Sequence, residues 1–63
     1  MKITYDRQSD ILIIHLAGKR PDFAEQQDNF ITHYAKNGVP VEIEVLDAKR
    51  TAKKMLAVIE SSH

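Results

Sequence analysis

The chain has no cysteine and contains only two glycines and two prolines among its 63 residues. Without disulfides, a domain this small needs another source of stability, and association with a second copy is the leading candidate. Two glycines cannot supply a glycine-rich loop that cradles phosphates. Nine basic residues balance nine acidic ones. The neutral balance excludes a global attraction to nucleic acid or to an anionic membrane, although local patches remain possible.

Long apolar runs are also missing from the chain. The longest, Ile11–Ile14, is interrupted by His15, whereas a membrane-spanning helix needs about 20 apolar residues. The opening segment, Met1–Asp6, is typical of a strand and not of an export signal. No repeat or linker divides the chain. We therefore expect a single soluble domain over residues 1–63, and the lack of cysteine fits a cytoplasmic location.

Alternation of polar and apolar residues predicts an antiparallel sheet over most of the chain. The expected strands, of which the third is weak and polar, lie at about 2–6, 11–17, 23–27, 30–36 and 39–46. Asp47 is a suitable N-cap for an amphipathic helix over about 48–60. The expected fold is α+β, an antiparallel β-meander of four to five strands with one C-terminal helix packed on one face.

The strongest local signal is Asn37-Gly38, because a two-residue Asn-Gly loop favours a type I′ hairpin in which both residues have positive φ. Pro40 follows this loop and has no N–H to donate, so we expect the final strand at a sheet edge, at least near its start. The pairs predicted from this loop and from the loop at 7–10 are Phe30 with Val45, Thr32 with Ile43, His33 with Glu42, Tyr34 with Val41, Ile3 with Ile14 and Tyr5 with Leu12.

One helix can cover only one side of this sheet, although the second strand is apolar on both sides. The side expected beneath the helix, here called the Ile14 face, carries Ile3, Tyr5, Leu12, Ile14, Leu16, Phe30, Tyr34, Val41, Ile43 and Val45. The opposite side, here called the Ile13 face, carries Ile11, Ile13, His15, Ile31, His33, Glu42 and Glu44. An exposed apolar cluster with a polar rim is typical of a contact site. The predicted interface therefore comprises Ile11, Ile13, Ile31 and His33.

A metal or acid–base site can be drawn on the Ile13 face from His15, His33, Glu42 and Glu44. Zinc requires three or four donors that converge at about 2 Å. If the polar third strand lies between the second and fourth strands, the two histidines are held apart. We therefore predict ordinary sheet histidines, with no metal site and no cofactor.

No catalytic constellation stands out elsewhere. The aspartates and glutamates of the loops match no calcium-binding loop, and the serines lack a histidine and acid arrangement or a nucleophile elbow. We therefore expect a protein that is not an enzyme.

Four basic residues of the predicted helix, Lys49, Arg50, Lys53 and Lys54, recur at helical spacing. The simplest interpretation of this basic stripe is the solvated outer face of an amphipathic helix. The alternative is a surface that binds phosphates of nucleic acid or an acidic partner. Because the whole chain is neutral, nucleic acid is the less favoured partner.

The chain resembles the small bacterial family catalogued as domain of unknown function 2283. The resemblance covers roughly Met1–Ala48 and rests on Lys2–Asp6, on Asp10-x-Leu12-x-Ile14-x-Leu16, on Glu25 and Asp28, on Asn37-Gly38 and on Ile43–Ala48. It implies a small strand-rich domain with a C-terminal helix, and it brings no activity or catalytic residues. Members are encoded beside toxin genes, which suggests an antitoxin or toxin-binding role.

These observations favour a noncatalytic interaction module over a binder of nucleic acid. The expected partner is a second copy of the chain, in a homodimer or higher homo-oligomer, and a toxin protein is the other candidate. No contact with membranes is expected.

Overall fold

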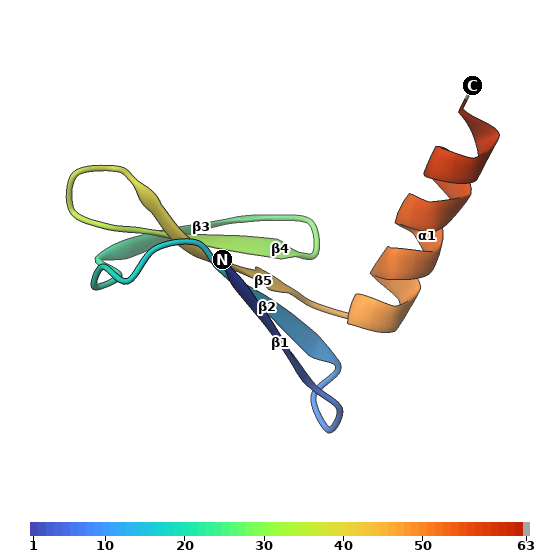
Figure 1. Ribbon diagram of the computed structural model, residues 1–63, viewed down its shortest axis with the longest axis horizontal. Coiled ribbons are helices and arrows are strands. Elements are labelled where there is room, and N and C mark those ends of the chain that lie inside the picture. The colour runs from blue at the N-terminus through green and yellow to red at the C-terminus, as the bar shows by residue number, and fades with distance from the viewer. Residues whose placement is uncertain (63) are drawn as a thin grey trace.

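The computed structural model describes residues 1–62, which form one antiparallel sheet of five strands followed by one helix (Figure 1). The elements are β1 (Lys2–Asp6), β2 (Ile11–His15), β3 (Phe23–Gln27), β4 (Phe30–Tyr34), β5 (Pro40–Val45) and α1 (Ala48–Ser61). The α+β class, the antiparallel strands and the C-terminal helix are confirmed. Within the described part of the chain, no helix is long and apolar enough to cross a membrane.

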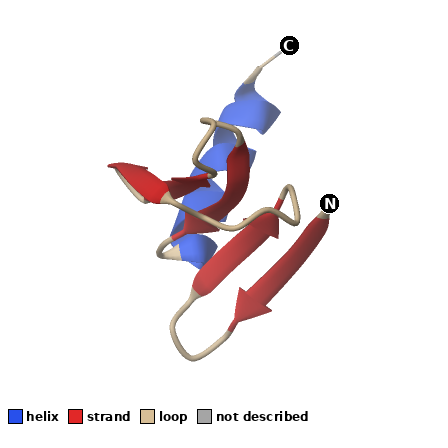
Figure 2. Ribbon diagram, turned by 90° about the vertical axis from the view of Figure 1, so that its left-hand side faces the viewer, coloured by secondary structure: helices blue, strands red, loops and turns tan. Residues whose placement is uncertain are grey.

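The strands lie in the order β1-β2-β5-β4-β3. A hairpin of β1 and β2 is thus joined to a three-stranded meander of β3, β4 and β5, as the red strands of Figure 2 show. β5 is a central strand, which corrects the expected edge position. Pro40 is tolerated because it is the first residue of β5, beyond the last regular pair with β2, which joins His15 to Glu42.

The turn after β4 is wider than the predicted two-residue loop. The Gly38 N–H donates to the Ala35 carbonyl and the Ala35 N–H donates to the Val39 carbonyl, each at 2.8 Å. Gly38 has a φ of 86°, whereas Asn37 is not among the residues with positive φ. A type I turn followed by a glycine in the left-handed region explains this pattern, so the predicted type I′ turn was wrong.

A bulge in β5 compensates for the extra loop residue. Tyr34 pairs with Pro40 rather than Val41, so that predicted pair was wrong, and the register shifts between His33 and Tyr34. Val41 is the additional residue on β5, and His33 again faces Glu42. The remaining predicted pairs are confirmed: Phe30 with Val45, Thr32 with Ile43, His33 with Glu42, Ile3 with Ile14 and Tyr5 with Leu12.

Asp10 in the β1–β2 loop anchors the first turn of α1. Asp47 stands at the N-cap position as predicted, but its side chain makes no cap hydrogen bond within the described residues. The Ala48 N–H donates to the Asp10 carbonyl at 3.0 Å, and the Lys49 N–H donates to the Asp10 carboxylate at 3.2 Å. The Tyr5 hydroxyl donates to the same carboxylate at 2.7 Å, and this bond raises the pKa of Tyr5 above its ordinary value of 10.0.

A second anchor joins α1 to the turn between β3 and β4. The Thr51 hydroxyl donates to the Leu46 carbonyl at 3.1 Å and accepts a hydrogen bond from the Asn29 amide at 3.3 Å. The Leu46 N–H donates to the Asn29 carbonyl at 2.8 Å. Both hairpin turns at this end of the sheet therefore hold the start of the helix.

Beyond its first turn, α1 points away from the sheet (Figure 1). Its buried residues are Ala48 and Thr51. The link from β5 consists of Leu46 and Asp47, and Asp47 adopts a left-handed φ of 48°. This short, sharply turned link and the two anchors set the direction of the helix. The expected packing of the helix across the Ile14 face is therefore not observed, and the helix contacts the sheet through its beginning.

The core of the described chain is small. Its buried apolar residues are Ala35, Val41, Val45 and Ala48, and no large side chain in residues 1–62 is fully buried. The sheet is a single layer, so most of its apolar side chains are only half covered by their neighbours. A stable domain ordinarily packs two layers around one core.

Candidate functional site

The two histidines and two glutamates of the Ile13 face lie together at its centre. Glu42 on β5 pairs with His15 on β2 at one side and with His33 on β4 at the other. The next row along the sheet is Ile13, Glu44 and Ile31. The predicted separation assumed that β3 lies between β2 and β4. The structure corrects this assumption, because β5 lies there and supplies both glutamates.

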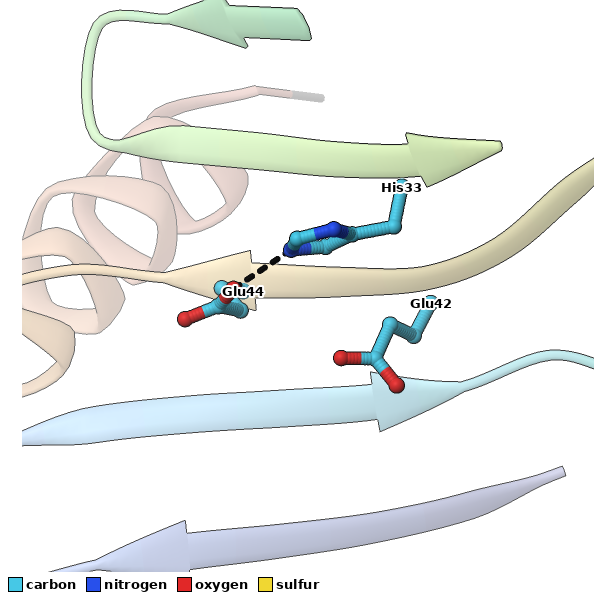
Figure 3. A group of neighbouring side chains, drawn as sticks. All are labelled: His33, Glu42 and Glu44. Carbon is cyan, nitrogen blue, oxygen red and sulfur yellow. Dashed lines mark hydrogen bonds and ion pairs between the residues drawn. The ribbon is translucent and has the colours of Figure 1, made fainter. Parts of the chain in front are cut away.

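The His33 side chain contacts the diagonally placed Glu44 and not the directly opposite Glu42 (Figure 3). His33 Nε2 lies 2.5 Å from Glu44 Oε1. His15 Nδ1 lies 3.7 Å from Glu42 Oε1, and His15 Nε2 lies 3.3 Å from the Thr4 hydroxyl. The predicted register of His33 with Glu42 holds for the backbone, whereas the imidazole contacts Glu44.

Three of these residues can direct donor atoms to one point. His33, Glu42 and Glu44 are all half-buried, and one ligand atom from each lies within 4.8 Å of the others. His63, the remaining histidine of the chain, lies outside the described residues. Chemically, one imidazole and two carboxylates can hold a divalent cation or share a proton.

The isoleucines of the predicted interface lie on one face of the sheet but are less exposed than a free contact surface requires. Ile11, Ile13 and Ile31 are half-buried on the Ile13 face, around the histidines and glutamates. Their role as an interface stays a prediction, because they are no more exposed than other residues of the central strands.

The more exposed apolar side chains belong to the opposite face and to the helix. Ile3 is 56% exposed, and Phe23, which stacks on Tyr34 with ring centroids 5.1 Å apart, is 43% exposed. On α1, Leu56 is 54% exposed and Ile59 is 66% exposed. The sequence does not predict this exposed surface, because its patterns place the helix over the Ile14 face. The shortness of the link at residues 46–47 is the signal that would have argued against that placement.

Two shallow hollows flank this surface, one over β3 and β4 and one beside α1. The first has a volume of about 540 Å³ and is lined by Glu25, Gln26, Gln27, Asp28, Phe30, Thr32 and Tyr34. The second has a volume of about 420 Å³ and is lined by Asp28, Asn29, Phe30, Thr51, Lys54 and Met55. Phe30 borders both hollows, which therefore adjoin where the helix leaves the sheet.

The basic stripe is exposed on α1, as the sequence predicts. Lys49, Arg50, Lys53 and Lys54 all lie at the surface. No ion pair is found between these side chains and an acidic group in residues 1–62. The stripe is therefore available to an outside partner, and its use stays a prediction.

Comparison with known proteins identifies the family and no activity. The family model described as "Protein of unknown function (DUF2283)" matches residues 2–49, from the start of β1 to the first turn of α1. No curated protein and no solved structure matches the chain. Because the match covers most of the 63 residues, the chain belongs to the DUF2283 family.

Proposed function

We propose that this protein is a noncatalytic interaction module that forms a homodimer, in which α1 of each copy covers the Ile14 face of the other. The observation that carries the proposal is the exposure of large apolar side chains on both surfaces. Ile3 on the sheet is 56% exposed and Ile59 on the helix is 66% exposed. Fully burying an exposed side chain of this size contributes about 1.5–3 kcal/mol, so burying the exposed part of each contributes less than this before other terms are counted.

The helix is amphipathic in the way this contact requires. Its apolar side, here called the helix stripe, comprises Ala52, Met55, Leu56, Val58 and Ile59. These residues follow the buried Ala48 and Thr51 at helical spacing, so the helix stripe continues the side that already touches the sheet. The basic stripe lies on the other sides of α1 and stays in water when the helix stripe is covered.

A second copy is a chemically suitable occupant. Each copy offers one uncovered apolar face and one uncovered helix stripe, so a two-fold arrangement satisfies both surfaces at once. The chain has a net charge of +0, so no net repulsion opposes the approach of two copies. Because the core is small and the chain has no cysteine, association supplies stability that a domain of this size otherwise lacks.

Solution mass tests the proposal. Sedimentation velocity over a wide range of protein concentrations is expected to give twice the 7.2 kDa of one chain. A mass of 7.2 kDa at every concentration would contradict self-association. A monomer that copurifies in fixed ratio with a different protein, such as a toxin, would assign the surface to that protein and support the antitoxin role instead.

The exposed basic stripe favours a second candidate function, contact with nucleic acid or an acidic protein. Replacing Lys49, Arg50, Lys53 and Lys54 by Gln is expected to abolish such binding, and wild-type binding is expected to weaken steeply as salt is raised. Fluorescence anisotropy with a labelled DNA duplex and with an acidic peptide measures both effects. Binding that is absent or insensitive to salt would eliminate this candidate.

A further inference from the structure

We propose that the Ile13 face binds one zinc ion through His33, Glu42 and Glu44, with His15 beside them as the fourth donor. The four side chains come from three adjacent strands, and the middle strand contributes both carboxylates. This site lies on the opposite side of the sheet from the proposed dimer contact, so the two proposals are independent.

The spacing of the donor atoms fits a zinc ion. Ligand atoms of His33, Glu42 and Glu44 lie within 4.8 Å of one another. Donors bound at about 2.0–2.2 Å in tetrahedral geometry are separated by about 3.4 Å. Small changes of side-chain rotamer bring the atoms to that separation. The 2.5 Å contact between His33 Nε2 and Glu44 Oε1 lengthens as zinc takes its place between them.

His15 lies next to these three residues, but it is not among those whose donor atoms lie within 4.8 Å of one another, so its side chain must change rotamer to complete the set. Its Nε2 lies 3.3 Å from the Thr4 hydroxyl, and its Nδ1 lies 3.7 Å from Glu42 Oε1. A hydrogen-bonding group on the outer nitrogen of a histidine fixes the orientation of the ring and favours binding through the inner nitrogen. Thr4 on β1 occupies that position, so all of β1, β2, β4 and β5 contribute to the arrangement.

The donor types favour zinc over the other common divalent ions. Imidazole nitrogens suit zinc and neighbouring transition metals, whereas magnesium and calcium prefer sites made entirely of oxygen. All three convergent residues are half-buried, which limits competition from water. The isoleucines at 13 and 31 flank Glu44 on both sides and add an apolar border.

Such a site would also join strands that are distant in sequence. β2 and β5 are connected by no hairpin, and a metal held by His15, His33 and the glutamates of β5 bridges them directly. Bound metal contributes its binding free energy to folding. In a sheet with a small core, this link would add stability that the apolar contacts do not provide.

Isothermal titration calorimetry of the metal-free 63-residue chain with zinc chloride tests the proposal. We expect one zinc per chain, and about a tenfold or greater rise in Kd on replacing Glu44 or His33 by Gln. Glu25→Gln is the matched control. Glu25 pairs with Thr32 on the Ile14 face, so this variant removes a carboxylate from the opposite face of the sheet. His63→Gln removes the remaining imidazole and is also expected to leave Kd unchanged.

A second ligand variant keeps the test decisive if Glu44→Gln fails to fold, which far-UV circular dichroism reports. Glu42 makes only the longer, 3.7 Å contact with His15, so Glu42→Gln should retain the sheet and still weaken zinc binding about tenfold. The proposal is overturned if the wild-type chain binds no zinc, or if Glu42→Gln binds it as tightly as Glu25→Gln.

Discussion

Replacing Leu56 and Ile59 together by Glu is expected to convert the dimer into a monomer. These residues are 54% and 66% exposed on the helix stripe, so they contribute little to the fold of one chain. In the proposed dimer they are buried against the Ile14 face of the partner. Introducing two carboxylates into that apolar contact requires their desolvation without partners, which costs far more than the contact can supply. Sedimentation velocity measures the change in mass.

The matched control places the same two charges on the other side of the same helix. Ala57→Glu with Ser61→Glu adds two carboxylates at exposed positions outside the helix stripe. This variant is expected to remain a dimer, because its carboxylates stay in water. Loss of the dimer in both double variants would show that charge on α1, and not burial of the helix stripe, controls association.

A third variant separates the two faces of the sheet. Ile13→Lys places a cation directly opposite Glu44, an arrangement that antiparallel strands accommodate well. If the dimer contact uses the Ile14 face, this variant keeps the mass of the dimer. A monomeric Ile13→Lys that is still folded would return the interface to the isoleucines predicted from the sequence.

Asp10→Ala is expected to lower the free energy of unfolding by about 2 kcal/mol. About half of this loss comes from removing the carboxylate that accepts the Lys49 N–H, since a lost helix cap costs about 1 kcal/mol. The other half comes from backbone strain, because residue 10 has a φ of 57° and a left-handed alanine costs roughly 1–2 kcal/mol. Urea denaturation measures the loss.

Asp10→Asn removes the negative charge of residue 10 but keeps an oxygen that can accept the Lys49 N–H. Asparagine also tolerates the left-handed region. We expect a loss of about 0.5 kcal/mol or less, set by the weaker interaction with the helix dipole. If Asp10→Ala is as stable as the wild type, Asp10 does not anchor the helix and the direction of α1 needs another cause.

Much of the fold follows from local patterns in the sequence. The alternation in residues 2–6, the apolar run at 11–15 and the turn at Asn37-Gly38 define two of the three hairpins that the structure contains. The register around Phe30 and Val45 is recovered even though the turn type is wrong, because the wider loop and the bulge at Val41 cancel. Hydrophobic patterning on a half-buried sheet selects one register over its neighbours.

The strand order and the helix direction depend on contacts between distant segments. No turn joins β2 to β5, so no local signal reports that they pair. The helix is directed by Asp10, whose carboxylate binds the Lys49 N–H from 39 residues away. The sequence therefore predicts Asp47, the candidate acceptor nearest in the chain, whereas the carboxylate that accepts from the helix start is that of Asp10.

The candidate metal site is likewise predicted in part by local patterns and in part decided by contacts between distant strands. His15, His33, Glu42 and Glu44 were recognised as one face from period-two alternation alone. The sequence predicts no convergence if the polar third strand lies between the strands of the two histidines, whereas the strand that lies there is β5, which carries both glutamates. Because β5 lies at the centre of the sheet, His15, Glu42 and His33 form one row across three strands, and Glu44 lies in the next row.

Contacts between chains test the central claim most directly, because the account requires a second copy to cover the Ile14 face. Isotope-filtered nuclear magnetic resonance detects these contacts. The sample is an equal mixture of isotope-labelled and unlabelled chains, and the filter keeps only signals between a labelled and an unlabelled chain. We predict contacts from the methyl groups of Met55, Leu56 and Ile59 of one chain to Ile3 and Ile14 of the other. Contacts of these helix methyls only within their own chain would contradict the account.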